Sequence, residues 1–250
     1  KYPKDFINSN VVGTFNLLIS ARNHFERIPS IRKNFFRLHH VSTDEVFGSL
    51  GENGYFNEST NYDPKSPYSA SKAASDHLVS AWENTYNLPV SLTNCSNNYG
   101  PWQYPEKLIP TVILNAISNK SIPLYGSGNN IRDWLHVDDH IDALLLSAII
   151  GKVGNKYCIG GDQEKTNKEI VIMICDYLDN IFKKDLSYKE LIKQVEDRPG
   201  HDFRYSIDSS LIKRDLDWEP KTNFNIGLEN TINWYLKNES WCLSQLVSNI

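Results

Sequence analysis

The stretch SPYSASKAASDHL, residues 66–78, predicts a helix that begins at Pro67 and runs to about Tyr86. Proline is favoured in the first helical turn, where its missing N–H group would have no partner. Tyr68 and Lys72 stand four positions apart, so their polar ends lie on one helix face. An ammonium group lowers the pKa of a neighbouring phenol, which is ordinarily about 10. The pair therefore predicts a base for a hydroxyl proton; the alternative is a core tyrosine beside a lysine that extends to solvent.

Polar residues precede this helix in HHVSTDEVFG, residues 39–48. The apolar run that leads into it predicts a buried strand, and ligands bind at the carboxyl ends of parallel strands. Ser42, Thr43, Asp44 and Glu45 follow at that end. Two carboxylates and a hydroxyl, facing a Tyr and a Lys, provide the groups of acid–base catalysis. Alternatively, the two acids are ordinary loop or helix-capping charges.

Helix and strand patterns alternate along the chain, which predicts βαβ units around a parallel sheet covered on both faces. The expected helices span residues 5–24, 67–86, 108–117, 138–149 and 167–182, and the expected strands lie at 35–42, 88–95, near 122, near 133 and at 155–161. The fold class predicted is therefore α/β.

The composition excludes several classes of protein. The net charge of −4 is small and the basic residues are scattered, so we expect no nucleic-acid partner. The four cysteines lie far apart without a C-x-x-C pair, which indicates reduced thiols and a cytoplasmic location. No apolar run approaches the roughly 18 residues of a membrane span, and no signal-peptide core begins the sequence. We therefore expect a soluble protein without a membrane partner.

The Gly-rich turn of a dinucleotide-binding sheet is missing from these residues. Such a sheet normally begins with a strand, that turn and a helix, whereas this sequence opens on a helix and contains no G-x-G-x-x-G. YGSGNN, residues 125–130, has two of the glycines without a following helix, so it predicts a turn between strands. The expectation is that the first strands and the Gly-rich turn lie outside the sequence given.

Two histidines in HVDDH, residues 136–140, raise the question of a metal site. The zinc pattern H-E-x-x-H requires Glu directly after the first histidine, and here Val137 takes that place. Asp138 is more simply the cap of the next helix. We therefore predict no metal site.

Together these segments resemble the extended short-chain dehydrogenase/reductases, and among them the dTDP-glucose 4,6-dehydratases. The resemblance covers essentially the whole chain. It rests on STDEVFG (42–48), SPYSASKAASDHL (66–78), NCSNNYGPWQYPEKLIP (94–110), PLYGSGNNIRDWLHVDDH (123–140), YCIGG (157–161) and DRPGHDFRYSID (197–208). The Tyr–Lys spacing occurs throughout the superfamily, whereas the Asp–Glu pair and the DRPGHD segment are shared by few members.

The resemblance implies catalytic roles for five residues in an NAD-dependent dehydration of dTDP-glucose. Tyr68, assisted by Lys72, would remove the proton of the sugar 4-hydroxyl while the C4 hydride passes to NAD, and Thr43 would hydrogen-bond the same oxygen. Glu45 would then take the C5 proton, Asp44 would protonate the departing 6-hydroxyl, and the hydride would return to C6. Asp44 must then be protonated and Glu45 ionised, so their environments must separate their pKa values.

The resemblance also implies binding residues. Those for NAD are Ser42, Tyr68, Lys72 and Asn98. Those for the nucleotide sugar are Thr43, Asn97, Lys107, Leu108, Pro123, Tyr125, Arg132, Asn167, Arg198 and His201. Arg132 and Arg198 suit a phosphate ligand, because a guanidinium donates hydrogen bonds in a fixed fork. For Arg132, a surface ion pair with Asp133 or Asp138 remains the alternative.

The resemblance implies a Rossmann-type doubly wound parallel sheet with a smaller interleaved C-terminal substrate domain. Residues 1–99 and 131–160 are expected to form the NAD-binding domain, and residues 100–130 and 161–250 the nucleotide-sugar-binding domain. A nucleotide-sugar 4-epimerase or decarboxylase is the alternative enzyme, but it generally lacks the Asp–Glu pair. A non-catalytic sensor would be expected to have lost Tyr68, Lys72 or Glu45.

A homodimer is expected as well. Residues 5–24 and 67–86 correspond to the helices that pair across a two-fold axis in the resembling family. Leu78, Val79 and Trp82 provide an apolar face on the second of these helices.

Overall fold

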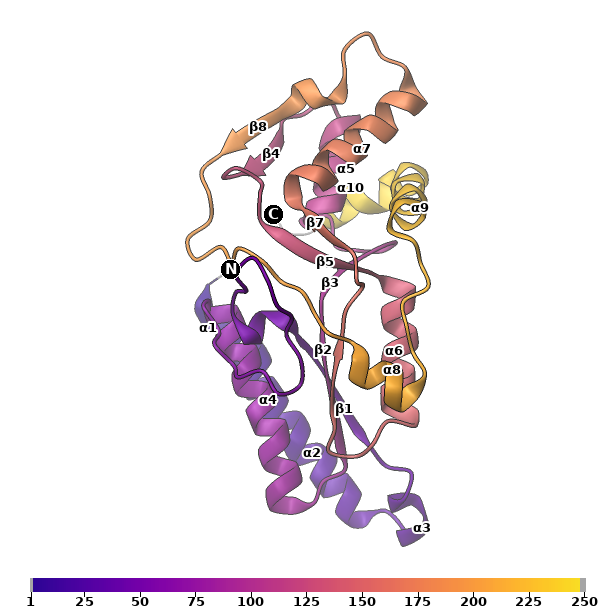
Figure 1. The fold of residues 1–250 in the computed structure, drawn as a ribbon. Coiled ribbons are helices and arrows are strands. Elements are labelled where there is room, and N and C mark those ends of the chain that lie inside the picture. Colours follow the sequence, from indigo (N-terminus) through magenta and orange to yellow (C-terminus); the bar gives the residue numbers. More distant parts are fainter. Residues whose placement is uncertain (1, 248–250) are drawn as a thin grey trace. The chain divides into compact units, whose positions relative to one another are not determined.

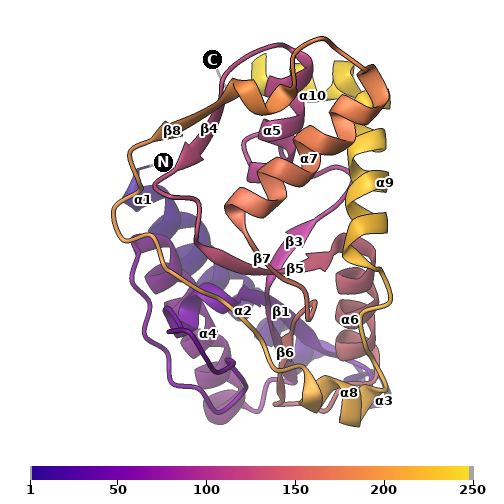
Figure 2. The same ribbon diagram turned by 45° about the horizontal axis from the view of Figure 1, so that its top comes forward.

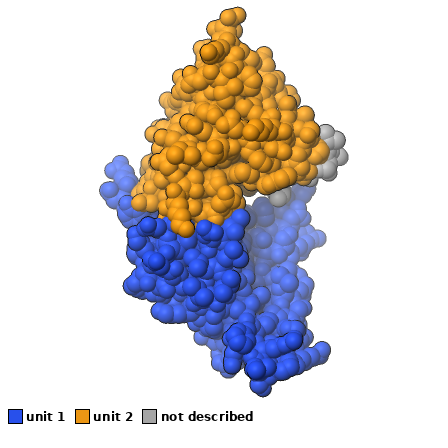
Figure 3. All heavy atoms as spheres, turned by 90° about the vertical axis from the view of Figure 1, so that its right-hand side faces the viewer, with its two compact units in different colours: residues 1–96, 140–160, 205–219 blue, residues 97–139, 161–204, 220–250 orange. Residues whose placement is uncertain are grey.

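The structure is a computed structural model that describes residues 2–247. The chain divides into two compact units, coloured separately in Figure 3. Unit 1 comprises residues 1–96, 140–160 and 205–219, and unit 2 comprises residues 97–139, 161–204 and 220–250. The chain therefore passes between the units several times, as an interleaved organisation requires.

The three strands of unit 1 form one parallel sheet, as the sequence predicts. They are β1 (Leu38–Thr43), β2 (Val90–Cys95) and β6 (Lys156–Ile159), in the order β1-β2-β6. In this register Thr43 is opposite Cys95, and Cys95 is opposite Ile159. All three carboxyl ends therefore lie at one edge, where an α/β sheet presents its ligand site.

Helices cover both faces of this sheet (Figures 1 and 2). On one face lie α2 (Gly13–Arg27) and α4 (Pro67–Tyr86), and on the other lie α6 (Val137–Ile149) and α8 (Ser210–Leu216). The side chains of Leu18, Val79, Leu88 and Val90 are fully or almost fully buried in one cluster of this unit. Each such side chain stabilises the fold by about 1.5–3 kcal/mol relative to an exposed one.

Helix α4 begins and ends at the predicted residues because its local sequence caps both ends. The Ser66 hydroxyl accepts from the Ser69 N–H, and the Ser69 hydroxyl accepts from the Ser66 N–H. This reciprocal box, followed by Pro67, satisfies N–H groups that have no partner in the first helical turn. Asn87 ends the helix in the left-handed conformation, with φ of 53°.

The helix predicted over residues 5–24 is not uniform. It consists of α1 (Pro3–Phe6), a π-helical segment (Ile7–Val12) and α2, which continues to Arg27. The Gly13 N–H bonds to the Asn8 carbonyl, five residues back, which widens the turn. Two short helices complete the N-terminal part, α3 (Ser30–Lys33) and the 3₁₀ helix η2 (Asp44–Phe47).

Unit 2 contains two small sheets covered by helices. In the first, β5 (Ile131–His136) pairs in parallel with β3 (Asn97–Tyr99) and antiparallel with β7 (Glu164–Thr166). In the second, β4 (Ile122–Tyr125) pairs in parallel with β8 (Ile192–Val195). The helices are α5 (Leu108–Ile117), α7 (Asn167–Phe182), the 3₁₀ helix η3 (Tyr188–Leu191), α9 (Phe224–Lys237) and α10 (Glu239–Val247). Strands β3, β7 and β8 were not predicted from the sequence.

Two sequence-based expectations differ from the structure in detail, and the predicted domain division stays a prediction. The compact units differ in composition from the predicted ligand-binding domains: unit 2 includes residues 97–99 and 131–139, and unit 1 includes residues 205–219. The predicted domains were defined by the ligand they bind, so they stay a prediction. Asp138 is not the residue before α6, because the helix begins at Val137; its N–H donates to the His136 imidazole at 3.3 Å. Val79 is buried in the core of unit 1, so it cannot contribute to an exposed apolar face.

None of the helices in residues 2–247 combines the length and apolar character needed to cross a bilayer. The four cysteines all lie in the described part of the chain, are buried, and form no disulfide.

Two histidines, the half-buried His39 and the buried His140, make unit 1 sensitive to acid. Burial lowers the pKa of His39 and of His140 to about 4 each. The unfolded chain, with a pKa near 6.5, then binds protons that the folded unit excludes, so stability falls as the pH drops from about 6.5 towards 4. The buried His140 contributes about 3 kcal/mol to this loss, and the more exposed His39 contributes less.

We expect chemical denaturation to show a lower unfolding free energy at pH 5 than at pH 7. His140→Leu should reduce that pH-dependent loss, because the substituted side chain takes up no proton. His24→Gln, at an exposed position of α2, should keep the loss of the original protein. An unchanged pH dependence in His140→Leu would contradict this assignment.

Candidate active site

The carboxyl end of β1 forms a tight polar turn in unit 1. The Thr43 hydroxyl accepts the Glu45 N–H at 3.3 Å and donates to the Asp44 carboxylate at 3.2 Å. Thr43 thereby caps the 3₁₀ helix that begins at Asp44. Asp44 is buried whereas Glu45 is partly exposed, so the adjacent carboxyl groups lie in different environments. This difference is what distinct acid and base roles require.

Helix α4 brings Tyr68 and Lys72 to the same end of β1. The Lys72 ammonium donates to the Val41 carbonyl at 2.8 Å. Glu45 and Asp44 both act electrostatically on the Tyr68 phenol. The structure therefore brings together the five residues predicted to be catalytic, all within unit 1.

The direction of the Tyr68 pKa shift corrects the expectation from the sequence. Burial raises the pKa of Tyr68 above that of an ordinary phenol, and the negative charge of Glu45 raises it further. Lys72 is not among the main causes of this shift, and burial lowers the pKa of Lys72 itself. Desolvation and the neighbouring acids therefore outweigh the ammonium, and the structure favours the neutral phenol.

Asp76 was missed by the sequence analysis. It follows Lys72 by four residues, as Lys72 follows Tyr68, so the three share one face of α4. Its buried carboxylate bonds to the side chains of His40, Ser42, Tyr62 and Asn94. The repeated spacing was the available signal, but an acid on a helix is usually a solvated charge.

In unit 2, Asp197 gathers several residues predicted to bind the nucleotide sugar. One carboxylate oxygen bonds to the His201 imidazole at 2.6 Å and accepts the Arg198 N–H at 2.8 Å. The Arg198 guanidinium lies 4.5 Å from the centre of the Tyr125 ring. Gly126, with φ of 54°, lies so close to Asp197 that a Cβ would come within 2.7 Å of its carboxylate. The YGSGNN and DRPGHD segments thus meet around one carboxylate.

Arg132 is buried and donates to backbone carbonyls of unit 2. Its guanidinium donates to the carbonyls of Ile131, Asp202 and Phe203 at 2.7, 2.9 and 3.3 Å. These bonds tie the DRPGHD segment to β5. An exposed surface ion pair, the alternative for this residue, is wrong because only 6% of Arg132 is accessible.

The other predicted binding residues lie on further elements of unit 2. Asn97 and Asn98 are in β3, and the Asn97 side-chain oxygen is buried with no hydrogen-bond partner among the described residues. Pro123 lies two positions before Tyr125 in β4, on the same face. Lys107 and Leu108 begin α5, and Asn167 begins α7.

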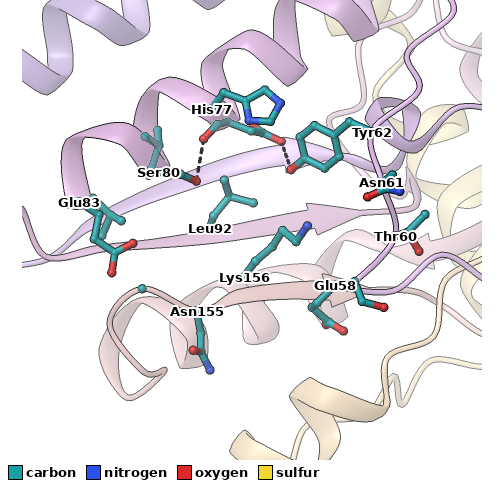
Figure 4. Close-up of a pocket in the computed structure, with 15 residues that line it drawn as sticks. Glu58, Thr60, Asn61, Tyr62, His77, Ser80, Glu83, Leu92, Asn155 and Lys156 are labelled. Atoms are coloured by element: carbon teal, nitrogen blue, oxygen red, sulfur yellow. Dashed lines mark hydrogen bonds between the residues drawn. The ribbon is translucent and has the colours of Figure 1, made fainter. Parts of the chain in front are cut away.

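A pocket of about 330 Å³ in unit 1 lies apart from the predicted catalytic residues (Figure 4). It is lined by α4, residues 58–62, β2 and residues 154–156, and Asp76 is part of the wall. Its lining includes Glu58, Tyr62, His77, Glu83, Leu92 and Lys156. None of the catalytic or ligand-binding residues predicted from the sequence lines it. In residues 2–247, no group of three His, Cys, Asp or Glu side chains is arranged to hold a metal ion.

Comparison with known proteins settles the family. A family model described as GDP-mannose 4,6 dehydratase matches residues 1–231. The dTDP-glucose 4,6-dehydratase 1 of Escherichia coli (strain K12) is 53% identical over 248 residues, which cover 96% of this chain and 69% of the relative. The chain belongs to the dTDP-glucose 4,6-dehydratase family. The resemblance inferred from the motifs is thus confirmed.

Solved structures of this dehydratase family agree with the fold. The Bacillus anthracis dTDP-glucose 4,6-dehydratase in complex with NAD has 46% identity and a TM-score of 0.85, covering 96% of this chain and 71% of that one. The Streptomyces venezuelae dTDP-glucose 4,6-dehydratase has 40% identity and a TM-score of 0.88, covering 98% and 70%. The predicted Rossmann-type α/β fold is therefore confirmed.

Proposed function

We propose that this protein dehydrates dTDP-glucose to dTDP-4-dehydro-6-deoxyglucose with NAD as cofactor. The observation that carries the proposal is the turn Thr43–Asp44–Glu45 at the end of β1, beside Tyr68 and Lys72 on α4. A chain with these residues is 53% identical to an enzyme of that name. The paired acids distinguish dehydration from epimerisation, which needs no general acid for a leaving hydroxyl.

The residues present fit an NAD molecule at the carboxyl edge of the unit 1 sheet. An ammonium has three N–H donors, and Lys72 uses one on the Val41 carbonyl. The Ser42 hydroxyl donates to Asp76, which leaves its oxygen able to accept. Ser42, Tyr68, Lys72 and Asn98 are the residues proposed to hold the cofactor. When bound, NAD supplies the hydride acceptor for oxidation at C4 and the hydride donor for C6.

The catalytic residues would act in two proton-transfer stages. Tyr68 takes the 4-hydroxyl proton, with Thr43 hydrogen-bonded to the same oxygen, and the resulting 4-ketone makes the C5 proton acidic. Glu45 then removes that proton while Asp44 donates its own to the 6-hydroxyl, which leaves as water. Protonation of Asp44 would remove one of the charges that raise the pKa of Tyr68, whereas burial and the ionised Glu45 still raise it.

Residues of unit 2 are proposed to bind the nucleotide and its two phosphates. The Arg198 guanidinium lies over the Tyr125 ring, and the His201 imidazole bonds to the Asp197 carboxylate. Both side chains are therefore oriented before a ligand binds. Pre-orientation reduces the entropy lost on binding. Thr43, Asn97, Lys107, Leu108, Pro123, Arg132 and Asn167 complete the proposed substrate-binding set.

Glu45→Gln tests the function and the assignment of roles. The amide keeps size and hydrogen bonding but removes the base for the C5 proton, so water loss should fall roughly 10²- to 10⁴-fold. Oxidation at C4 should persist, and rapid quench with mass spectrometry should detect the 4-ketoglucose nucleotide, lighter than the substrate by two hydrogens.

Two controls accompany this variant in the intact protein. Glu52→Gln, at an exposed loop position of unit 1, should dehydrate the substrate at the original rate. Tyr68→Phe should form neither the ketone nor the product, because no base remains for the first step. Normal product formation by Glu45→Gln, with normal solvent deuterium at C5, would show that Glu45 is not the base.

We also propose that the protein forms a homodimer through α2 and α4. The support is that α2 exposes Phe15, Leu17 and Ile19, of which Leu17 is 65% accessible. Light scattering at micromolar concentration should give the mass of two chains, and Leu17→Glu should shift the population towards one chain. Leu186→Glu, at a similarly exposed position of unit 2, should leave the mass unchanged. A monomeric original protein would contradict the proposal.

A further inference from the structure

The carboxylate of Asp76 is the meeting point of three segments of unit 1. Only 1% of the residue is exposed. From β1, the Ser42 hydroxyl donates at 2.8 Å and the His40 imidazole lies at 3.1 Å. From β2, the Asn94 amide donates at 3.2 Å, and from the preceding loop the Tyr62 hydroxyl donates at 2.9 Å. The donors from Ser42, Tyr62 and Asn94 converge on Oδ2, and the His40 imidazole lies at Oδ1, so both oxygens of the carboxylate have partners.

The Asn94 side chain extends this arrangement to the catalytic turn. Its amide nitrogen donates both to Asp76 and to the Thr43 carbonyl, the latter at 3.0 Å. Asn94 is fully buried, and its side-chain oxygen has no hydrogen-bond partner among the described residues. Its amide orientation therefore depends on the two acceptors, Asp76 and Thr43.

These contacts fix consecutive residues of β1 against α4. Lys72 bonds to the Val41 carbonyl, Asp76 to the Ser42 hydroxyl, and Asn94 joins Asp76 to Thr43. Asp44 and Glu45 follow directly, and their turn is capped by the Thr43 hydroxyl. A displacement of Thr43 would therefore move both acids relative to Tyr68.

We propose that Asp76 is a positioning residue: its carboxylate, acting through Ser42 and Asn94, holds the Thr43–Asp44–Glu45 turn in place beside Tyr68 and Lys72. The inference deepens the proposed function and rests on it for the catalytic consequence. Asp76 itself transfers no proton and contacts no substrate in this role. Hydrogen bonds to a buried ionised acceptor are about twice as strong as neutral ones, so the charge matters as well as the shape.

Asp76→Asn removes the charge with little change in size and replaces one acceptor oxygen by an amide donor. Because a misplacement of about 1 Å can cost roughly 10²-fold in rate, we expect kcat to fall about 10- to 100-fold. KM for dTDP-glucose should stay within about threefold, because neither Asp76 nor Asn94 is among the residues proposed to bind the nucleotide sugar. Peptide-level hydrogen exchange across residues 41–47 should become faster.

Matched variants separate positioning from general destabilisation. Ser75→Ala removes a fully buried hydroxyl next to Asp76 whose hydrogen bonds, among residues 2–247, go to the Ser71 and Lys72 carbonyls within α4. Tyr62→Phe removes the one Asp76 donor that lies outside the sheet strands. Both should keep kcat within about threefold of the original and leave exchange across residues 41–47 unchanged.

Asn94→Ala provides an independent route if Asp76→Asn does not fold. It breaks the link to the Thr43 carbonyl while leaving Asp76 intact, and it should lower kcat in the same way. Where both variants fold, the double variant should lose little more activity than either alone, because the two residues act through one connection.

The outcomes distinguish this inference from the proposed function. An original protein that dehydrates dTDP-glucose, with Asp76→Asn and Asn94→Ala both retaining kcat, would overturn the positioning role. Additive losses, or equal losses in Ser75→Ala, would also overturn it. If the original protein were inactive on dTDP-glucose but hydrogen exchange at residues 41–47 still rose in Asp76→Asn, the proposed function would fail while the structural connection held.

Discussion

The arrangement of α4 against the sheet of unit 1 depends on the buried carboxylate of Asp76, which requires hydrogen-bond donors. Burying an ionised group without partners costs several kcal/mol, and Asp76 avoids this cost through hydrogen bonds from β1, β2 and the loop before α4. Those partners can reach it only if α4 lies at one position along the strands. The same constraint sets the end of β1, where Thr43 caps the turn that carries Asp44 and Glu45. Local capping, sheet register and placement of the candidate catalytic groups are therefore linked through one side chain.

Much of the fold could be predicted because local signals agree with the tertiary structure. α4, α5 and α7 have the predicted bounds, since the cap residues Ser66 and Thr166 mark the starts of α4 and α7 and apolar spacing marks the bodies. The strands β3, β7 and β8 could not be predicted, because their short segments NNY, EKT and IKQV are largely polar and lack the apolar run that marks β4 and β6. The π-helical segment at Ile7–Val12 also follows from packing rather than from a local sequence signal; the Asn10 amide in it bonds to Ser71 of α4.

The candidate site was predictable in its residues but not in its electrostatics. Strand-end placement and helical spacing located Thr43, Asp44, Glu45, Tyr68 and Lys72. The sign of the Tyr68 pKa shift depends on burial and on Glu45, neither of which spacing alone reveals. The partners of Arg132 and the gathering of Arg198 and His201 around Asp197 likewise depend on contacts between segments distant in the sequence.

The residues at the carboxyl end of β1 are proposed to catalyse the loss of water from a thymidine nucleotide sugar. The most direct measurement incubates the intact protein and NAD with dTDP-glucose, UDP-glucose and GDP-mannose, and identifies the products by mass and NMR. The account predicts loss of water from dTDP-glucose, with a 4-keto group and a 6-methyl group in the product, at a higher kcat/KM than for the other two. Conversion of any of these sugars to its 4-epimer without loss of water, or preferred dehydration of GDP-mannose, would contradict it.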